Sequence, residues 1–174
     1  MSEYRNYNDL LRFAYSEGEV SRIEKVREEN DKLEVRFENS REEWLKKIKP
    51  LFDDLTKNFK LEKADIIIDI QSKGLSYKQI IIEEISMLLN KRSKIEVSLR
   101  RLKQEKHALF STASTIKLNA SEKIMMIDGN LSENIRRMTL FDIHIEFLRA
   151  SQKNLESLGF TVKNIIELHN YLGR

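Results

Sequence analysis

Apolar residues recur with a heptad spacing over two long stretches of this chain. The steps between them alternate between three and four positions, which is typical of the contact seam on one face of a coiled-coil helix. Asn30 falls on the first seam, where a buried asparagine commonly fixes register or strand number. The pattern predicts an all-α fold, a long helical hairpin or coiled coil. The seams comprise Ile23, Val26, Asn30, Leu33 and Phe37, and then Ile81, Ile85, Leu88, Arg92, Ile95, Leu99, Leu102, Lys106 and Leu109.

Capping signals predict where the first helices begin and end. Ser40 followed by Glu43 is a capping box, so we expect a second helix to begin there. Because proline clashes with the preceding helical turn, Pro50 predicts a break or kink near Lys49. Residues 61–75 are expected to form a connector, extended and buried around its three isoleucines.

The longest helix is expected to run from Ser76 to Phe110, with Ser76 and Gln79 as its capping box. The two cationic seam positions in this helix predict that its seam opens toward the C-terminal end. The Ser/Thr/Ala-rich residues 111–120 predict a loop, and residues 121–127 a short helix.

Two further helices are expected at the C-terminal end of the chain. Ser132 is expected to cap the first of them, which ends at Gly159. A last helix starts at Thr161 and carries apolar residues on more than one face, so it has to be covered on several sides. Such a helix commonly caps its own core, but we expect a neighbouring subunit to provide the cover. The predicted oligomerisation residues are Phe160, Val162, Ile165, Ile166, Leu168 and Leu172.

Composition and motifs argue against catalysis. The chain has no cysteine, which excludes disulfides and thiolate metal sites. Its histidines, His107, His144 and His169, lack the spacing of metal ligands and are expected at the surface or at helix ends. Without a glycine-rich phosphate loop or converging carboxylates, we expect no enzymatic activity, no metal and no cofactor. Without an apolar signal core or a bilayer-length apolar run, we expect no membrane contact and a cytoplasmic location, the host cytoplasm if the chain is phage-encoded.

A basic run on the longest predicted helix is the candidate binding site. The whole chain carries a net charge of only +3, but a local cationic stripe is enough to follow a phosphate backbone. The residues alone support equally well the ordinary alternative, a solvated helix face that binds nothing. Aromatic residues are few nearby, so electrostatics would dominate over base stacking. The candidate nucleic-acid contacts are Lys91, Arg92, Lys94, Arg100, Arg101, Lys103 and Lys106.

Several segments after residue 60 together suggest a known family. They are Asp65–Asp69, Tyr77, Leu89–Lys91, Lys123–Asp128 and Ile145–Leu148, and the most family-like stretches are residues 158–166 and 171–174. Together these segments resemble the UvsY-type recombination mediators of T4-like bacteriophages. The resemblance implies a mediator-like helical domain over residues 61–174, preceded by an N-terminal helical or coiled-coil arm, residues 1–60, that has no counterpart in short family members.

The resemblance also implies a function. Such mediators form hexamers or heptamers, held together in part by the C-terminal helix. They bind single-stranded DNA and help a RecA-like recombinase displace the single-strand-binding protein. The family's DNA contacts match Lys103 and Lys106, with Arg100 and Arg101 one turn earlier. Residues 109–112 depart from the Tyr-Tyr-x-Gly segment that the family often carries. The alternative is a structural coiled-coil adaptor, or a phage assembly or scaffold protein, with no nucleic-acid partner.

Overall fold

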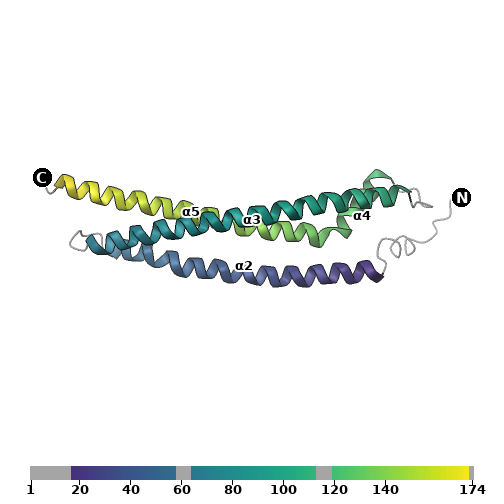
Figure 1. Ribbon diagram of the computed structural model, residues 1–174, viewed down its shortest axis with the longest axis horizontal. Coiled ribbons are helices and arrows are strands. Elements are labelled where there is room, and N and C mark those ends of the chain that lie inside the picture. The colour runs from purple at the N-terminus through teal and green to yellow at the C-terminus, as the bar shows by residue number, and fades with distance from the viewer. Residues whose placement is uncertain (1–16, 58–63, 113–118, 173–174) are drawn as a thin grey trace. The chain divides into compact units, whose positions relative to one another are not determined.

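The computed structural model describes residues 17–57, 64–112 and 119–172. These residues form four helices, which Figure 1 labels, and no strand is present among them. The all-α prediction is therefore confirmed. The helices are α2 (Glu17–Lys57), α3 (Ala64–Thr112), α4 (Ala120–Asn130) and α5 (Ser132–Leu172).

The predicted boundaries at Ser40, Ser76 and Gly159 are wrong because a helix continues through each of them. Helix α2 runs past Ser40 and contains Pro50, so the predicted break near Lys49 is wrong, while a kink there stays a prediction. Helix α5 runs past Gly159 and Thr161 without ending. Helix α3 begins at Ala64, so residues 64–75 are helical rather than extended. A capping residue stabilises a helix end by only about 1 kcal/mol. Packing of a continuous buried face stabilises the helix by more, so the helix continues through the capping residue. Parts of the predicted connector and loop, residues 61–63 and 113–118, lie outside the described residues.

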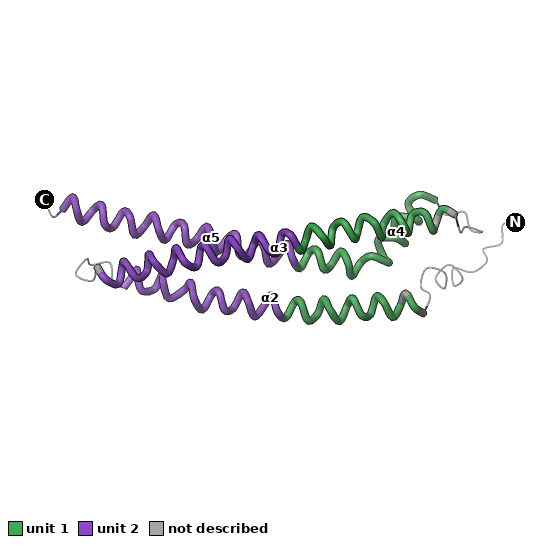
Figure 2. Tube along the Cα trace, viewed as in Figure 1, with its two compact units in different colours: residues 1–35, 91–140 green, residues 36–90, 141–174 purple. Residues whose placement is uncertain are grey.

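The chain divides into two compact units, which Figure 2 distinguishes. Unit 1 comprises residues 1–35 and 91–140, and unit 2 comprises residues 36–90 and 141–174. Each of the three long helices contributes one stretch to each unit, while α4 belongs to unit 1 alone. The predicted domain boundary near residue 60 falls in residues 58–63, outside the described residues, and stays a prediction.

Unit 2 holds most of the buried apolar side chains. Helices α2 and α3 form an antiparallel hairpin, in which Trp44 meets the Tyr77 ring edge-on at 6.1 Å. Helix α5 packs against the hairpin, and the Phe37 and Phe141 rings lie 5.3 Å apart. The buried apolar residues are Phe37, Trp44, Ile48, Leu51, Leu55, Ile67, Ile70, Ile81, Ile85, Leu88, Phe141, Ile145, Leu148, Leu155, Leu158, Val162 and Ile165. Burial of so many large side chains is the main stabilising contribution in this unit.

Unit 1 has a much smaller apolar core. Among its described residues, Ile127 and Leu131 are buried, and Leu99, Leu102 and Met126 pack against them. The seam of α3 is only half-buried from Arg92 to Lys106, in agreement with the predicted opening of the seam. Apolar contacts alone therefore do not account for the packing of α2 residues 17–35 in this unit.

Polar contacts centred on Asn30 hold this stretch of α2 against α5. The Asn30 side chain is fully buried; its Nδ2 donates to the Glu133 carbonyl oxygen at 2.7 Å, and its Oδ1 accepts from Arg137 Nε at 2.7 Å. Because both partners belong to α5, this asparagine specifies the register between α2 and α5 within one chain. Ion pairs surround it, namely Arg27–Glu133, Arg136–Asp31, Arg136–Glu34 and Arg137–Glu29.

Candidate nucleic-acid interface

The seven predicted nucleic-acid contacts all lie on the unit 1 stretch of α3. Residues 91–106 contain seven lysines and arginines but two glutamates, a net charge of +5. Arg92 and Lys106, which occupy seam positions, are half-buried. The other five side chains are exposed, namely Lys91, Lys94, Arg100, Arg101 and Lys103. The surface of this helix segment is therefore strongly basic.

Helical periodicity sorts the exposed cations onto two faces. Lys91, Lys94 and Arg101 are three and seven positions apart and fall on one face, which we call the α3 stripe. Arg100 and Lys103 lie away from this stripe, and Lys103 Nζ contacts Asp128 Oδ1 of α4 at 2.9 Å. A strand that follows the α3 stripe would therefore meet three of the seven predicted residues directly.

Carboxylates offset part of this charge. Glu96 contacts both Arg92, at 3.2 Å, and Arg100, at 2.5 Å, and Glu105 contacts Arg101 at 2.9 Å. Ion pairs four residues apart at a helix surface typically contribute only about 0.3–0.5 kcal/mol, so they hold these arginines weakly. Within the part of the chain that the structure describes, no acidic side chain pairs with Lys91 or Lys94. Lys91 and Lys94 are thus the two cations of the α3 stripe without a paired carboxylate among the described residues, whereas Arg101 contacts Glu105.

One histidine departs from the prediction. His107 and His169 are exposed, but His144 is 1% exposed in the core of unit 2. Its ring stacks on Phe37 with centroids 4.3 Å apart, and its Nε2 lies 3.4 Å from Glu84 Oε1. A surface position for this residue is therefore wrong. Helix α5 is covered on two sides, so its buried stripe is wider than a single seam and includes position 144.

The contact between His144 and Glu84 predicts an acid-sensitive contribution to stability. Hydrogen bonds from His144 and then Trp44 lower the pKa of the Glu84 carboxyl below its ordinary value, although burial raises it. Because the folded-state pKa is the lower one, the carboxylate stabilises the fold above about pH 4.3, and this stabilisation is lost as pH falls through the folded-state pKa. We expect urea midpoints, followed by circular dichroism between about pH 6 and 3, to fall more steeply for the wild type than for Glu84→Gln. Glu83→Gln, at the exposed neighbouring carboxyl, should keep the wild-type slope; a wild-type slope in Glu84→Gln would contradict the assignment.

The six predicted oligomerisation residues separate into two groups. Val162 and Ile165 are buried within the chain's own core, so they do not present an outer surface. Phe160, Leu168 and Leu172 are 67%, 55% and 73% exposed, and Ile166 is half-buried. Large apolar side chains exposed close together are typical of a contact surface. The role of these four residues in oligomerisation stays a prediction.

Phe160 lines a groove between α3 and α5 in unit 2. The groove has a volume of about 530 Å³, and Leu75 of α3 lines it as well. Gly74 lies on its α3 side, where an added Cβ would meet Leu158 Cδ2 at 3.3 Å, and Gly159 lies on its α5 side. Because the two glycines have no side chains, they leave room for the groove at this surface.

Over residues 17–57, 64–112 and 119–172, no three His, Asp or Glu side chains gather as a metal site requires. In the same ranges, none of the helices has an apolar stretch of the length needed to traverse a lipid bilayer. Comparison of the chain with protein-family models, with curated proteins and with solved structures finds no match.

Proposed function

We propose that this chain is an oligomeric, single-stranded-DNA-binding recombination mediator that helps load a RecA-like recombinase onto DNA coated with single-strand-binding protein. The observation that carries the proposal is the exposed α3 stripe within a segment of net charge +5. The resemblance over residues 61–174 supplies the biological role. Catalysis, a metal and a cofactor have no part in it.

The charge distribution supports binding to the DNA backbone rather than to bases. Lysine and arginine neutralise phosphates and release counterions, so binding is independent of sequence and weakens steeply with salt. On one chain the α3 stripe offers about three phosphate contacts, which is a weak site. Several copies joined through Phe160, Leu168 and Leu172 would present the stripe repeatedly, and the contacts would then add along one strand.

Charge reversal of the α3 stripe tests the proposal. Each phosphate contact to a single strand contributes about 0.7 to the slope of log affinity against log salt. The triple variant Lys91→Glu, Lys94→Glu, Arg101→Glu is therefore expected to lose at least about 100-fold in affinity at 0.1 M salt. Fluorescence anisotropy of a labelled oligothymidine across a salt series measures the loss, and light scattering should show an unchanged assembly mass.

A matched control separates the stripe from overall charge. Lys49→Glu, Arg149→Glu, Lys153→Glu also reverses two lysines and one arginine, all exposed and all in unit 2. This control is expected to bind DNA with nearly wild-type affinity. Equal losses in both triples would assign the effect to net charge alone. Absence of wild-type binding even at low salt would refute the proposal.

The loading step needs its own assay. A RecA-class recombinase hydrolyses ATP when it assembles on single-stranded DNA, and bound single-strand-binding protein delays that assembly. With both proteins from the same source, the chain is expected to shorten the delay, and the α3 stripe triple is expected not to do so. A shortened delay with the triple would separate loading from DNA binding.

The ion pairs of α3 favour a second candidate, a structural coiled-coil adaptor. Arg92, Arg100 and Arg101 all contact glutamates of their own helix, as on an ordinary solvated helix face. An adaptor would be indifferent to DNA and would assemble as two or three chains. A mass of six or more subunits by light scattering favours the mediator.

A further inference from the structure

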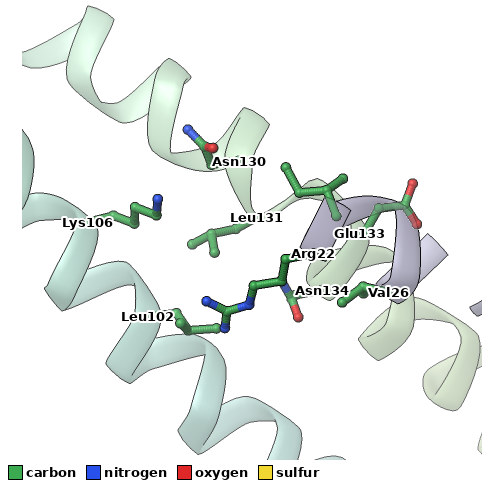
Figure 3. Close-up of a pocket in the computed structure, with 9 residues that line it drawn as sticks. Arg22, Val26, Leu102, Lys106, Asn130, Leu131, Glu133 and Asn134 are labelled. Carbon is green, nitrogen blue, oxygen red and sulfur yellow. The ribbon is translucent and has the colours of Figure 1, made fainter. Parts of the chain in front are cut away.

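The groove between α3 and α5 in unit 2 lies beside an exposed aromatic ring. Phe160 lines the groove and is 67% exposed, and Leu75, which is 61% exposed, lines it from α3. A Cβ added to Gly159 would meet no atom within 4 Å, so the space in front of this glycine is open. At about 530 Å³ the groove is large enough for an aromatic side chain. By contrast, the hollow beside Leu102 in unit 1 (Figure 3) has a volume of about 30 Å³, the share of one water molecule in the liquid.

The two charges nearest to Phe160 along α5 have opposite signs and flank it almost symmetrically. Glu156 precedes Phe160 by four positions and Lys163 follows it by three, so all three lie on one face of the helix. Glu156 and Lys163 also line the groove, the first half-buried and the second exposed. Reversing the direction of the helix exchanges the two charges. This face is therefore complementary to a second copy of itself.

An antiparallel pair of α5 helices, with a twofold axis between Gly159 and Phe160, brings unlike groups together. Glu156 of each copy then faces Lys163 of the other copy, and this contact occurs twice. Phe160 of each copy faces Gly159 of the other, at the place where the glycine leaves the groove open. A parallel pair in register would instead oppose each charge with the same charge.

We infer that the groove is the contact between two copies of this chain, in which the Phe160 ring of each copy enters the groove of the other beside Gly159. Burial of the two rings supplies the main attraction, and the flanking charges specify the direction. The contact rests on the proposed function, which requires an oligomer, but it does not require DNA. A twofold contact alone produces dimers, so an assembly of six chains needs a second contact, for which Leu168 and Leu172 are exposed.

The ion pairs that these side chains form within one chain are compatible with the contact. Glu156 Oε1 lies 3.0 Å from Lys78 Nζ of α3, and Lys163 Nζ lies 3.6 Å from Glu167 Oε1. Such pairs at a surface contribute little to stability. An ammonium group has three donors and a carboxylate accepts several hydrogen bonds, so each group can contact a second partner.

Filling the groove tests the contact on the full chain. Gly159→Met places a side chain in the open space, and methionine favours a helix more than glycine does, so circular dichroism should show undiminished thermal stability. The dissociation constant of self-association, from sedimentation without DNA, is expected to rise at least about tenfold, as for a residue at the centre of an interface. Asn154→Met adds the same side chain at an exposed position of α5 outside the groove and should keep the wild-type value. Equal constants for Gly159→Met and the wild type would overturn the inference.

Exchanging the two charges tests the antiparallel direction. Glu156→Lys alone opposes two lysines across the contact and Lys163→Glu alone opposes two glutamates, so each should weaken self-association about three- to tenfold. The double variant restores opposite charges between antiparallel copies and is expected to recover the wild-type constant. The exchange does not restore the pairs with Lys78 and Glu167, so recovery reports on the contact between copies. Losses that add in the double variant would overturn the antiparallel contact.

Self-association and DNA binding are measured separately, so the two proposals fail separately. Chains that associate through the groove but do not bind the labelled oligothymidine would refute the mediator and leave the contact in place. A wild type that stays monomeric at tens of micromolar would overturn the contact, whether or not it binds DNA.

Discussion

Replacing Trp44 with alanine is expected to lower the free energy of unfolding by about 3–5 kcal/mol. The indole is 6% exposed in the core of unit 2 and lies edge-on to the ring of Tyr77. Its removal leaves a cavity that the long, stiff helices around it cannot close. It also takes away the Nε1–H that donates to Glu84 Oε2 at 3.0 Å. Lost burial, cavity formation and an unsatisfied acceptor thus act in the same direction.

Urea unfolding followed by circular dichroism measures this effect. Trp44→Phe keeps most of the apolar contact but loses the indole donor, so we expect an intermediate loss. Leu45→Ala changes the next residue on the same helix, which is 54% exposed, and should alter stability by no more than about 0.5 kcal/mol. A Trp44→Ala variant as stable as Leu45→Ala would mean that the indole is not part of the core.

Replacing Asn30 with alanine is expected to cost about 2–4 kcal/mol. An asparagine at a coiled-coil seam often reduces stability, because its polar amide takes the place of an apolar side chain. In a symmetric coiled coil the two asparagines face each other, so a substitution removes both and leaves no unpaired partner. Here the partners are a backbone carbonyl, Glu133 and Arg137, and all of them remain after the substitution. Arg137 Nε and Glu133 Oε2 would each lose a hydrogen bond in a largely buried site. The penalty for unsatisfied groups therefore exceeds the gain from removing the amide.

The same unfolding measurement tests this variant against Asn39→Ala. Asn39 is exposed on the same helix, so its replacement should have little effect and controls for helix propensity. Asn30→Leu should also be destabilised, although less than Asn30→Ala, because apolar burial of about 1.5–3 kcal/mol offsets part of the loss. A leucine variant more stable than the wild type would show that the polar contacts around Asn30 are not net stabilising.

Heptad periodicity predicted the fold class and much of the core from the sequence. Asn30, Phe37 and Ile81 lie at predicted seam positions and are buried, because the spacing reflects the geometry of side-by-side helices directly. Helix ends were harder to predict. Ser40 and Gly159 carry the local chemistry of a cap, but the apolar faces on either side of them continue, and burial of a continuous face stabilises more than a cap does.

The candidate site shows the same division between local and distant information. The α3 stripe was predictable because its cations are neighbours along one helix. The contact of Lys103 with Asp128 of α4 was not, because no local pattern specifies which helices lie side by side. The burial of His144 was not predicted for a related reason. Helix α5 contacts two other helices in unit 2, and these contacts widen the buried face of α5. The heptad spacing of one helix indicates a contact with one partner helix and does not reveal a contact with a second one.

The contrast between apolar contacts in unit 2 and polar contacts in unit 1 has a consequence for α2. Added salt screens ion pairs but leaves apolar burial intact or strengthens it. Backbone amides over residues 17–35 should therefore exchange with deuterium sooner as ionic strength rises, while those over residues 36–57 remain protected. One uninterrupted helix would then unfold locally and reversibly over its N-terminal half while its C-terminal half stays folded.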